Sequence, residues 1–196
     1  LGGTPVVCGG RGSSTFSYTE KCFRFKNSVW EEFASMKEKR DATAAVMHNG
    51  KLHVFGGSSG SKLQTTETIN VDGEVSDGPD LPTAVFYHAM TAINDTVSIL
   101  SGGWTITNAY FIQTWYYNHD TETFTSGPNL LQGRLWHGSS TNVDQVKKDK
   151  IVVVTGGLTS GSVRLASTEM LINGQWQTGN IKCKIEKEDF YMLQTG

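Results

Sequence analysis

The sequence predicts an all-β fold made of about four repeated, four-stranded antiparallel sheets. Three observations support this prediction: a glycine pair that recurs after an apolar run, a β-prone run that follows each pair, and a large apolar residue further on. The chain of 196 residues is 37% hydrophobic and 18% charged. It is therefore long and apolar enough to bury a core.

The glycine pairs set the period of the repeat. They end the apolar runs "PVVCGG", "LHVFGG", "SILSGG" and "IVVVTGG", and their first glycines are 47, 46 and 54 residues apart. A period of about 50 residues is typical of one propeller blade. Glycine has no Cβ, so a pair lets the backbone turn sharply where inner strands crowd together. We expect a structural role for Gly9, Gly10, Gly56, Gly57, Gly102, Gly103, Gly156 and Gly157.

The rest of each period agrees with this assignment. A further β-prone run occurs at "TEKCFRF", "TETINV", "QTWYYNHDTE" and "STEMLIN", each after a connection rich in Ser, Thr and Gly. A slot for a large apolar residue follows at Trp30, Val75, Phe124 and Trp176. The resulting alignment places Arg40 with Val85 and Arg134, and Thr43 with His88 and His137. It predicts repeats over 1–36, 37–81, 82–130 and 131–182, with 183–196 starting a further blade or closing the ring.

These features resemble the kelch-repeat family of β-propellers over nearly the whole chain. The resemblance rests on the glycine pairs, the large apolar slot, and Arg40 and Arg134 ahead of the next inner strand. It implies a propeller, of which about four blades would be a fragment. The second repeat departs from the family by having Ile69 and Val75 where Tyr and Trp are common. The first repeat lacks an inner strand before "PVVCGG". The tail "DFYMLQTG" would either supply that strand or begin a fifth blade.

One segment gives a competing local signal. Residues Glu31 to Met47, "EEFASMKEKRDATAAVM", are rich in helix formers and would read as a helix in isolation. The repeat alignment instead predicts an outer strand, a loop and an innermost strand there, because tertiary context can override propensity.

The three cysteines and one Asn-x-Thr triplet indicate whether the protein is extracellular or cytoplasmic. Cys8 and Cys22 fall on neighbouring predicted strands, so either a disulfide or two free thiols fits, while Cys183 is left for a partner outside this chain. The triplet "NDT" at Asn94 is a candidate glycosylation site in a predicted hairpin turn. Secreted invertebrate kelch proteins have a similar "VVCGG" followed by a later Cys. That resemblance implies an extracellular protein, with the cytoplasm as the alternative.

Charge and motifs argue against several function classes. The net charge is -2, and the basic clusters "KEKR" and "KKDK" contain acids, so we expect no nucleic-acid binding. No apolar run is long enough to span a membrane, and a secretion signal would have been removed before "LGGTPVV".

The motif "GGSSG" at Gly56 fits a nucleophile elbow but belongs to a repeated glycine pair. The histidines lack metal-ligand spacing, so we expect no catalytic residue, metal or cofactor.

Function is therefore expected on a loop surface. Loops from fourth to first strands and from second to third strands should gather at one face, where arginine and aromatic side chains often anchor partners. The candidates are Arg40, Tyr87, Trp104, Arg134 and Trp136. These aromatics would alternatively pack against a neighbouring blade. The sequence predicts a noncatalytic protein-interaction or scaffold module, with a galactose-oxidase-like enzyme or carbohydrate-binding propeller as the alternative. Its partner would be another protein, further copies of the chain, or the remaining blades of a parent protein.

Overall fold

The computed structural model describes residues 1, 3–12, 16–107, 109–143 and 150–179. These residues form strands, turns and one short 3-10 turn, η1 (Ser160–Ser162), with no α-helix among them. Within the same ranges, no helix has the length and apolar character needed to cross a bilayer. The chain divides into two units, Leu1–Phe86 and Tyr87–Gly196.

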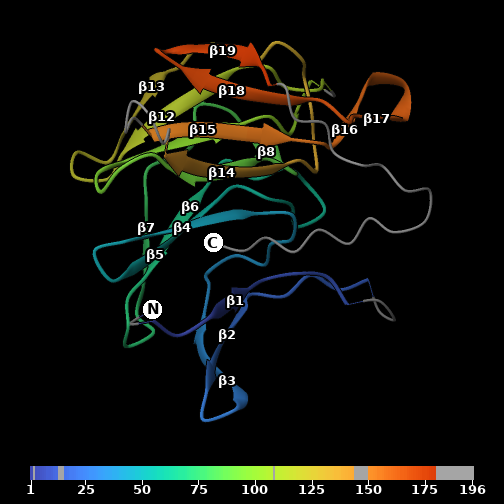
Figure 1. The fold of residues 1–196 in the computed structure, drawn as a ribbon. Coiled ribbons are helices and arrows are strands. Elements are labelled where there is room, and N and C mark those ends of the chain that lie inside the picture. The colour runs from blue at the N-terminus through green and yellow to red at the C-terminus, as the bar shows by residue number, and fades with distance from the viewer. Residues whose placement is uncertain (2, 13–15, 108, 144–149, 180–196) are drawn as a thin grey trace. The chain divides into compact units, whose positions relative to one another are not determined.

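The first unit contains a three-stranded and a four-stranded antiparallel sheet (Figure 1). The three-stranded sheet has the order β1 (Val6–Cys8), β2 (Lys21–Lys26) and β3 (Val29–Ser35). The four-stranded sheet has the order β4 (Ala44–His48), β5 (Lys51–Phe55), β6 (Thr66–Ile69) and β7 (Val75–Asp77). A short strand, β8 (Val85–Phe86), ends the unit. The first repeat thus has three strands among its described residues, not four, because no inner strand precedes β1.

The segment from Glu31 to Met47 is strand and loop, which confirms the repeat-based prediction over the helical one. Within β4, buried and more exposed residues alternate, and Ala44 and Val46 face the interior. Alternation with a period of two is the pattern of a strand with one covered face. Pairing with β5, from Ala44 opposite Phe55 to His48 opposite Lys51, outweighs the local helix propensity.

The second unit contains two four-stranded antiparallel sheets and a small hairpin (Figure 1). One sheet consists of β9 (Ala89–Ala92), β10 (Val97–Ser101), β12 (Thr114–Asn118) and β13 (Thr123–Ser126). The other consists of β14 (Gly138–Val143), β15 (Lys150–Thr155), β18 (Thr168–Ile172) and β19 (Gln175–Thr178). β11 (Trp104–Thr105) follows β10 in the chain and is not part of the four-stranded sheet. β16 (Leu158–Thr159) pairs with β17 (Val163–Arg164).

Each unit has a core in which its two sheets pack against each other. In the first unit, Cys22 and Met36 pack with Val54 and Ile69 of the four-stranded sheet. The second core brings together buried residues from both sheets, namely Ile99, Leu130, Val152, Val154, Leu171 and Trp176. Burial of these side chains is the main favourable contribution to folding. Each sheet lies inside one predicted repeat, and the repeat boundaries themselves stay a prediction.

One glycine of each pair, namely Gly9, Gly57, Gly102 or Gly157, lies where a side chain would not fit. All eight glycines have positive φ. A Cβ on Gly57 would lie 2.6 Å from the Asp41 carbonyl oxygen, and one on Gly102 would lie 2.5 Å from that of Arg134. Both distances are too short for a carbon, so the chain passes each corner only because glycine has no side chain.

Candidate interaction surface

Loops of two kinds leave each sheet at the same end. Successive antiparallel strands reverse direction, so the connections from second to third strand and from fourth to next first strand share one end. We call this the loop end. In the second unit it comprises residues 87–88, 102–107, 109–113, 127–137 and 156–167. The opposite end, which we call the hairpin end, carries the turns between first and second strands and between third and fourth strands.

Three loops, which lead into the sheets that begin with β4, β9 and β14, each contain a residue with left-handed backbone at the aligned position. The φ angles are 50° at Ala42, 58° at Tyr87 and 54° at Trp136. Each of these residues stands two positions after the aligned Arg40, Val85 or Arg134. Left-handed backbone costs a non-glycine residue about 1–2 kcal/mol, and such residues are uncommon. The loop therefore imposes a fixed, unfavourable conformation on the side chain that it presents.

Two of these residues form an aromatic pair in the second unit. The rings of Tyr87 and Trp136 are 4.8 Å apart at an interplanar angle of 69°. The Trp136 backbone N–H donates to the Tyr87 carbonyl oxygen at 3.1 Å. Edge-to-face contact is a favoured aromatic geometry. Trp136 is nonetheless 48% exposed, so a large aromatic side chain is held in place at the surface.

Further apolar side chains occupy the same loop end. Trp104 and Tyr110 form a second aromatic pair with centroids 4.9 Å apart. Ile106, Ile112 and Val163 are exposed. These three β-branched residues are not among the sequence-based candidates, because the pattern of their segments indicates only polar connections. Their occurrence within Ser- and Thr-rich loops is the signal that could have identified them.

Two predicted surface residues lie in the interior. Arg40 and Arg134 are both 0% exposed, so the expectation that they contact a partner is corrected. Arg40 donates from Nη1 to the Gly56 carbonyl oxygen at 2.7 Å and from Nη2 to Glu67 Oε1 at 2.6 Å. A buried guanidinium needs such partners because its charge is costly to desolvate.

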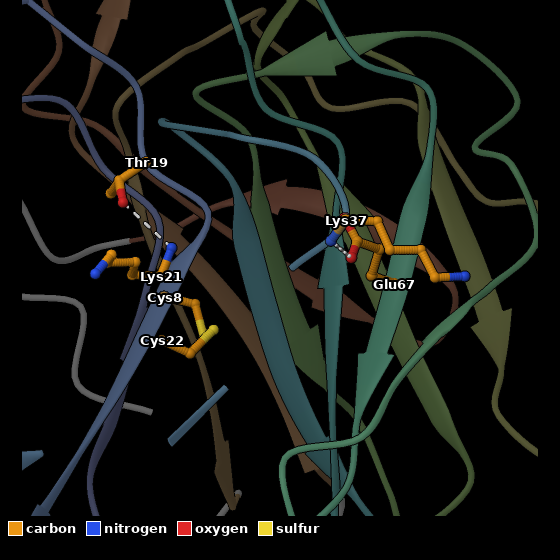
Figure 2. The surroundings of a disulfide bond; sticks show 6 residues. All are labelled: Cys8, Thr19, Lys21, Cys22, Lys37 and Glu67. Carbon is orange, nitrogen blue, oxygen red and sulfur yellow. Dashed lines mark hydrogen bonds between the residues drawn. A yellow bond between two sulfur atoms is a disulfide. The ribbon is translucent and has the colours of Figure 1, made fainter. Parts of the chain in front are cut away.

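The arginine contacts are repeated in the second unit. Arg134 donates to the Gly156 carbonyl oxygen at 2.9 Å and to Glu169 Oε1 at 2.6 Å. The second oxygen of each carboxylate accepts a loop backbone N–H, from Lys37 at 2.6 Å and from Leu131 at 2.7 Å. Figure 2 shows the Glu67 contact with Lys37.

The glutamates belong to an ion pair that sequence analysis missed. Their signal was the Thr-Glu of "TETI" and "TEML", aligned as Glu67 and Glu169. In the third repeat, the positions of the arginine and glutamate hold Val85 and Trp115. Both members are therefore replaced together in that repeat.

Cys8 and Cys22 form a disulfide that joins β1 to β2 (Figure 2). The two residues are directly opposite each other, with Cα atoms 4.1 Å apart. The aligned pair in the fourth repeat, Thr155 and Thr168, is linked by hydroxyls 3.1 Å apart. In the first sheet, which has three strands among the described residues, the disulfide thus takes the place of a weaker cross-strand link. Cys183 lies outside the described residues.

The loop end of the first unit presents cations over aromatic rings. The Arg11 guanidinium carbon lies 5.7 Å from the Phe16 ring centroid and 5.9 Å from that of Tyr18. Its Nε is 3.7 Å from Asp41 Oδ2. Lys62 Nζ lies 5.7 Å from the Phe86 ring centroid. Cation–π contacts of this kind stabilise exposed sites by about 0.5–1 kcal/mol.

Burial and the contact with Ser101 indicate a structural role for His137. His137 is almost fully buried, and its Nε2 is 3.1 Å from Ser101 Oγ. Burial, with smaller effects of the Arg134 charge and His88, lowers the pKa of His137 to about 3. Ser58, the nucleophile that "GGSSG" would supply, is buried and pairs through its backbone with Asp41. Among the described residues, no three His, Cys, Asp or Glu side chains are grouped so as to hold a metal ion.

Comparison with known proteins agrees with this architecture. The chain is 32% identical over 121 residues to Kelch-like protein 33 of Homo sapiens. The match covers 59% of this chain and 22% of the human protein, so the chain spans about a fifth of that relative. No family model matches the chain. The similarity and the all-β structure of antiparallel sheets fit a kelch-type protein.

Proposed function

We propose that this protein is a noncatalytic interaction module that binds a protein partner through the loop end of its sheets. The observation that supports the proposal is Trp136, which is 48% exposed yet fixed against Tyr87. Tryptophan and tyrosine are enriched among the residues that dominate binding energy. An aromatic side chain that is already positioned loses little conformational entropy when a partner covers it.

Other exposed side chains of the loop end support the same proposal. Ile106, Ile112 and Val163 add exposed apolar area on loops at this end. Aliphatic side chains around an aromatic anchor exclude water once a partner is bound. The charged residues of the described loop-end segments in this unit are Arg134, which is buried, and Arg164. A partner segment with apolar or aromatic side chains would complement such a surface.

The proposed compartment is the extracellular space, with the cytoplasm as the alternative. The disulfide between Cys8 and Cys22 supports it, because disulfides persist in oxidising compartments and are rare in the cytosol. Mass analysis of the protein from its natural source, after alkylation without a reductant, tests the placement. Alkylation of both cysteines would contradict it.

The binding proposal can be tested with a matched pair of variants. Trp30 is 52% exposed, lies on the outer strand β3 and contacts Phe25, so it matches Trp136 in type, exposure and aromatic contact. The tagged wild-type chain is used to capture extracellular proteins, and each captured protein is purified and titrated against the wild type, Trp136→Ala and Trp30→Ala. Loss of at least about 2 kcal/mol at an anchor weakens affinity by about 30-fold.

We expect that loss for Trp136→Ala and near wild-type affinity for Trp30→Ala. Thermal unfolding of both variants shows whether they remain folded at the assay temperature. Partners that tolerate Trp136→Ala but are lost with Trp30→Ala would place binding on the outer strand and refute the proposal.

A further inference from the structure

The turn between β9 and β10 has a defined arrangement around Asn94. Asn94 and Asp95 are exposed at its tip. The Asn94 side-chain oxygen, Oδ1, accepts the Thr96 N–H at 2.9 Å, the Val97 N–H at 2.8 Å and the Thr96 hydroxyl at 3.2 Å. Three donors of the turn therefore converge on one atom of this side chain.

This arrangement leaves the amide nitrogen available. In a planar amide, Nδ2 lies across Cγ from Oδ1, so fixing the oxygen against the turn directs the nitrogen away from it. Asn94-Asp95-Thr96 is also an Asn-x-Thr triplet, the acceptor sequence for N-linked glycans. The exposed turn provides room for a bulky substituent.

We propose that Asn94 carries an N-linked oligosaccharide. Nδ2 forms a bond to the anomeric carbon of a sugar donated by a polyprenyl pyrophosphate. The sugar–oxygen bond breaks with its electron pair leaving on the pyrophosphate, and Nδ2 loses one proton. The step needs no oxidant or reductant, and it requires passage through a secretory compartment, in line with the disulfide between Cys8 and Cys22.

The position of Asn94 also separates the glycan from the proposed binding surface. The turn joins the first and second strands of its sheet, so it belongs to the hairpin end. Tyr87 and Trp136 belong to the loop end. The glycan therefore extends from the end opposite to Trp136 and leaves that side chain uncovered. This separation of the glycan from the binding surface, the second part of the proposal, rests on the proposed function.

Two other asparagines provide internal comparisons. Asn118 Oδ1 accepts the N–H groups of Asp120 and Thr121 at 2.9 and 3.0 Å, and Asn70 Oδ1 accepts those of Asp72 and Glu74 at 3.0 and 2.9 Å. Asn118, like Asn94, accepts from the second and third residues after it, whereas Asn70 accepts from the second and fourth. Neither Asn118 nor Asn70 has Thr or Ser two residues later. Asp120→Thr would complete a triplet at Asn118, on another hairpin-end turn of the same sheet.

The test is secretion of the full chain from cultured animal cells behind a cleavable signal. A carboxyl-terminal Asn-x-Thr tag reports that each molecule has reached the glycosylating compartment. We expect peptide mass analysis to find a glycan at Asn94 in the wild type and in Thr96→Ser, and none in Asn94→Gln or Thr96→Ala. Asp120→Thr in the Asn94→Gln background should regain one glycan, at Asn118.

An unmodified Asn94 on molecules whose tag is glycosylated would overturn the proposal. Hydroxyl-radical footprinting before and after enzymatic removal of the glycan tests the second part, and we expect equal labelling of Trp136. Increased labelling after removal would refute the separation of glycan and surface while leaving glycosylation and partner binding standing.

Discussion

Arg40 and Glu67 form an ion pair in the interior, with Arg40 Nη2 2.6 Å from Glu67 Oε1 and both side chains almost completely buried. The pair links the loop before β4 to the third strand of the following sheet. Arg134 and Glu169 repeat the relationship at the same distance of 2.6 Å. Because all four residues are internal, their effect on binding should arise through stability.

Removing one partner of this pair should strongly destabilise the first unit. Arg40→Ala leaves the Glu67 carboxylate buried without its cation, which typically lowers the free energy of unfolding by about 3–5 kcal/mol. Urea denaturation followed by circular dichroism measures the loss. Arg40→Met together with Glu67→Leu should lose less than the sum of the single changes, and strict additivity would show that the two residues are not coupled.

The glycine corners can be tested with a pair of substitutions in one unit. Gly50 and Gly57 have φ of 73° and 98°, but a Cβ on Gly50 would meet no atom within 4 Å, whereas one on Gly57 would lie 2.6 Å from the Asp41 carbonyl oxygen. Gly50→Ala should lose about 1 kcal/mol from left-handed strain alone. Gly57→Ala should lose a further 1–3 kcal/mol or so from overpacking, measured by urea denaturation. Equal losses would contradict the close-packed corner.

The disulfide should contribute measurably to the first sheet. It closes a loop across a sequence separation of 14 residues, for which the chain-entropy model gives about 3 kcal/mol. Cys8→Thr with Cys22→Thr, which copies the aligned Thr155 and Thr168, should lower the free energy of unfolding by about that amount. It should also accelerate hydrogen exchange in β1 and β2. Unchanged exchange would show that the sheet is held without the bond.

Stability should fall with acidification because of buried histidine. Burial lowers the pKa of His137 to about 3, against 6.5 when unperturbed. Below pH 6.5 the unfolded chain takes up this proton while the folded chain does not, so stability falls by up to about 1.4 kcal/mol per pH unit until pH 3. Above pH 6.5 His137 has no such effect.

The acid sensitivity can be assigned with single variants. His137→Gln should flatten the pH dependence of urea unfolding between pH 6.5 and about 3. His53, whose pKa is lowered to about 4 mainly by burial, contributes in the same direction. A His137→Gln profile as steep as that of the wild type would show that other groups cause the loss.

The repeat pattern made much of the fold predictable from sequence. The glycine pairs and the runs after them located strands correctly even over Glu31 to Met47, where local propensity favoured a helix. Pairing between strands carried more weight than intrinsic preference there. Four strands were expected in each sheet, and the first sheet has three among the described residues.

The candidate site was harder to predict because exposure is a tertiary property. The sequence predicts both Trp136 and Arg40 as exposed loop residues, yet Trp136 is exposed and Arg40 is buried. Arginine is common both at interfaces and in buried ion pairs. Only the folded structure brings Glu67, 27 residues away in sequence, to Arg40 as its partner.

Ala42, Tyr87 and Trp136 share a left-handed backbone conformation although their side chains differ. Because the surrounding loop enforces the same backbone around an alanine, a tyrosine and a tryptophan, the residue there can be exchanged without redesigning the sheet behind it. Recognition can therefore diversify by single codon changes, one sheet at a time, on a framework that stays constant.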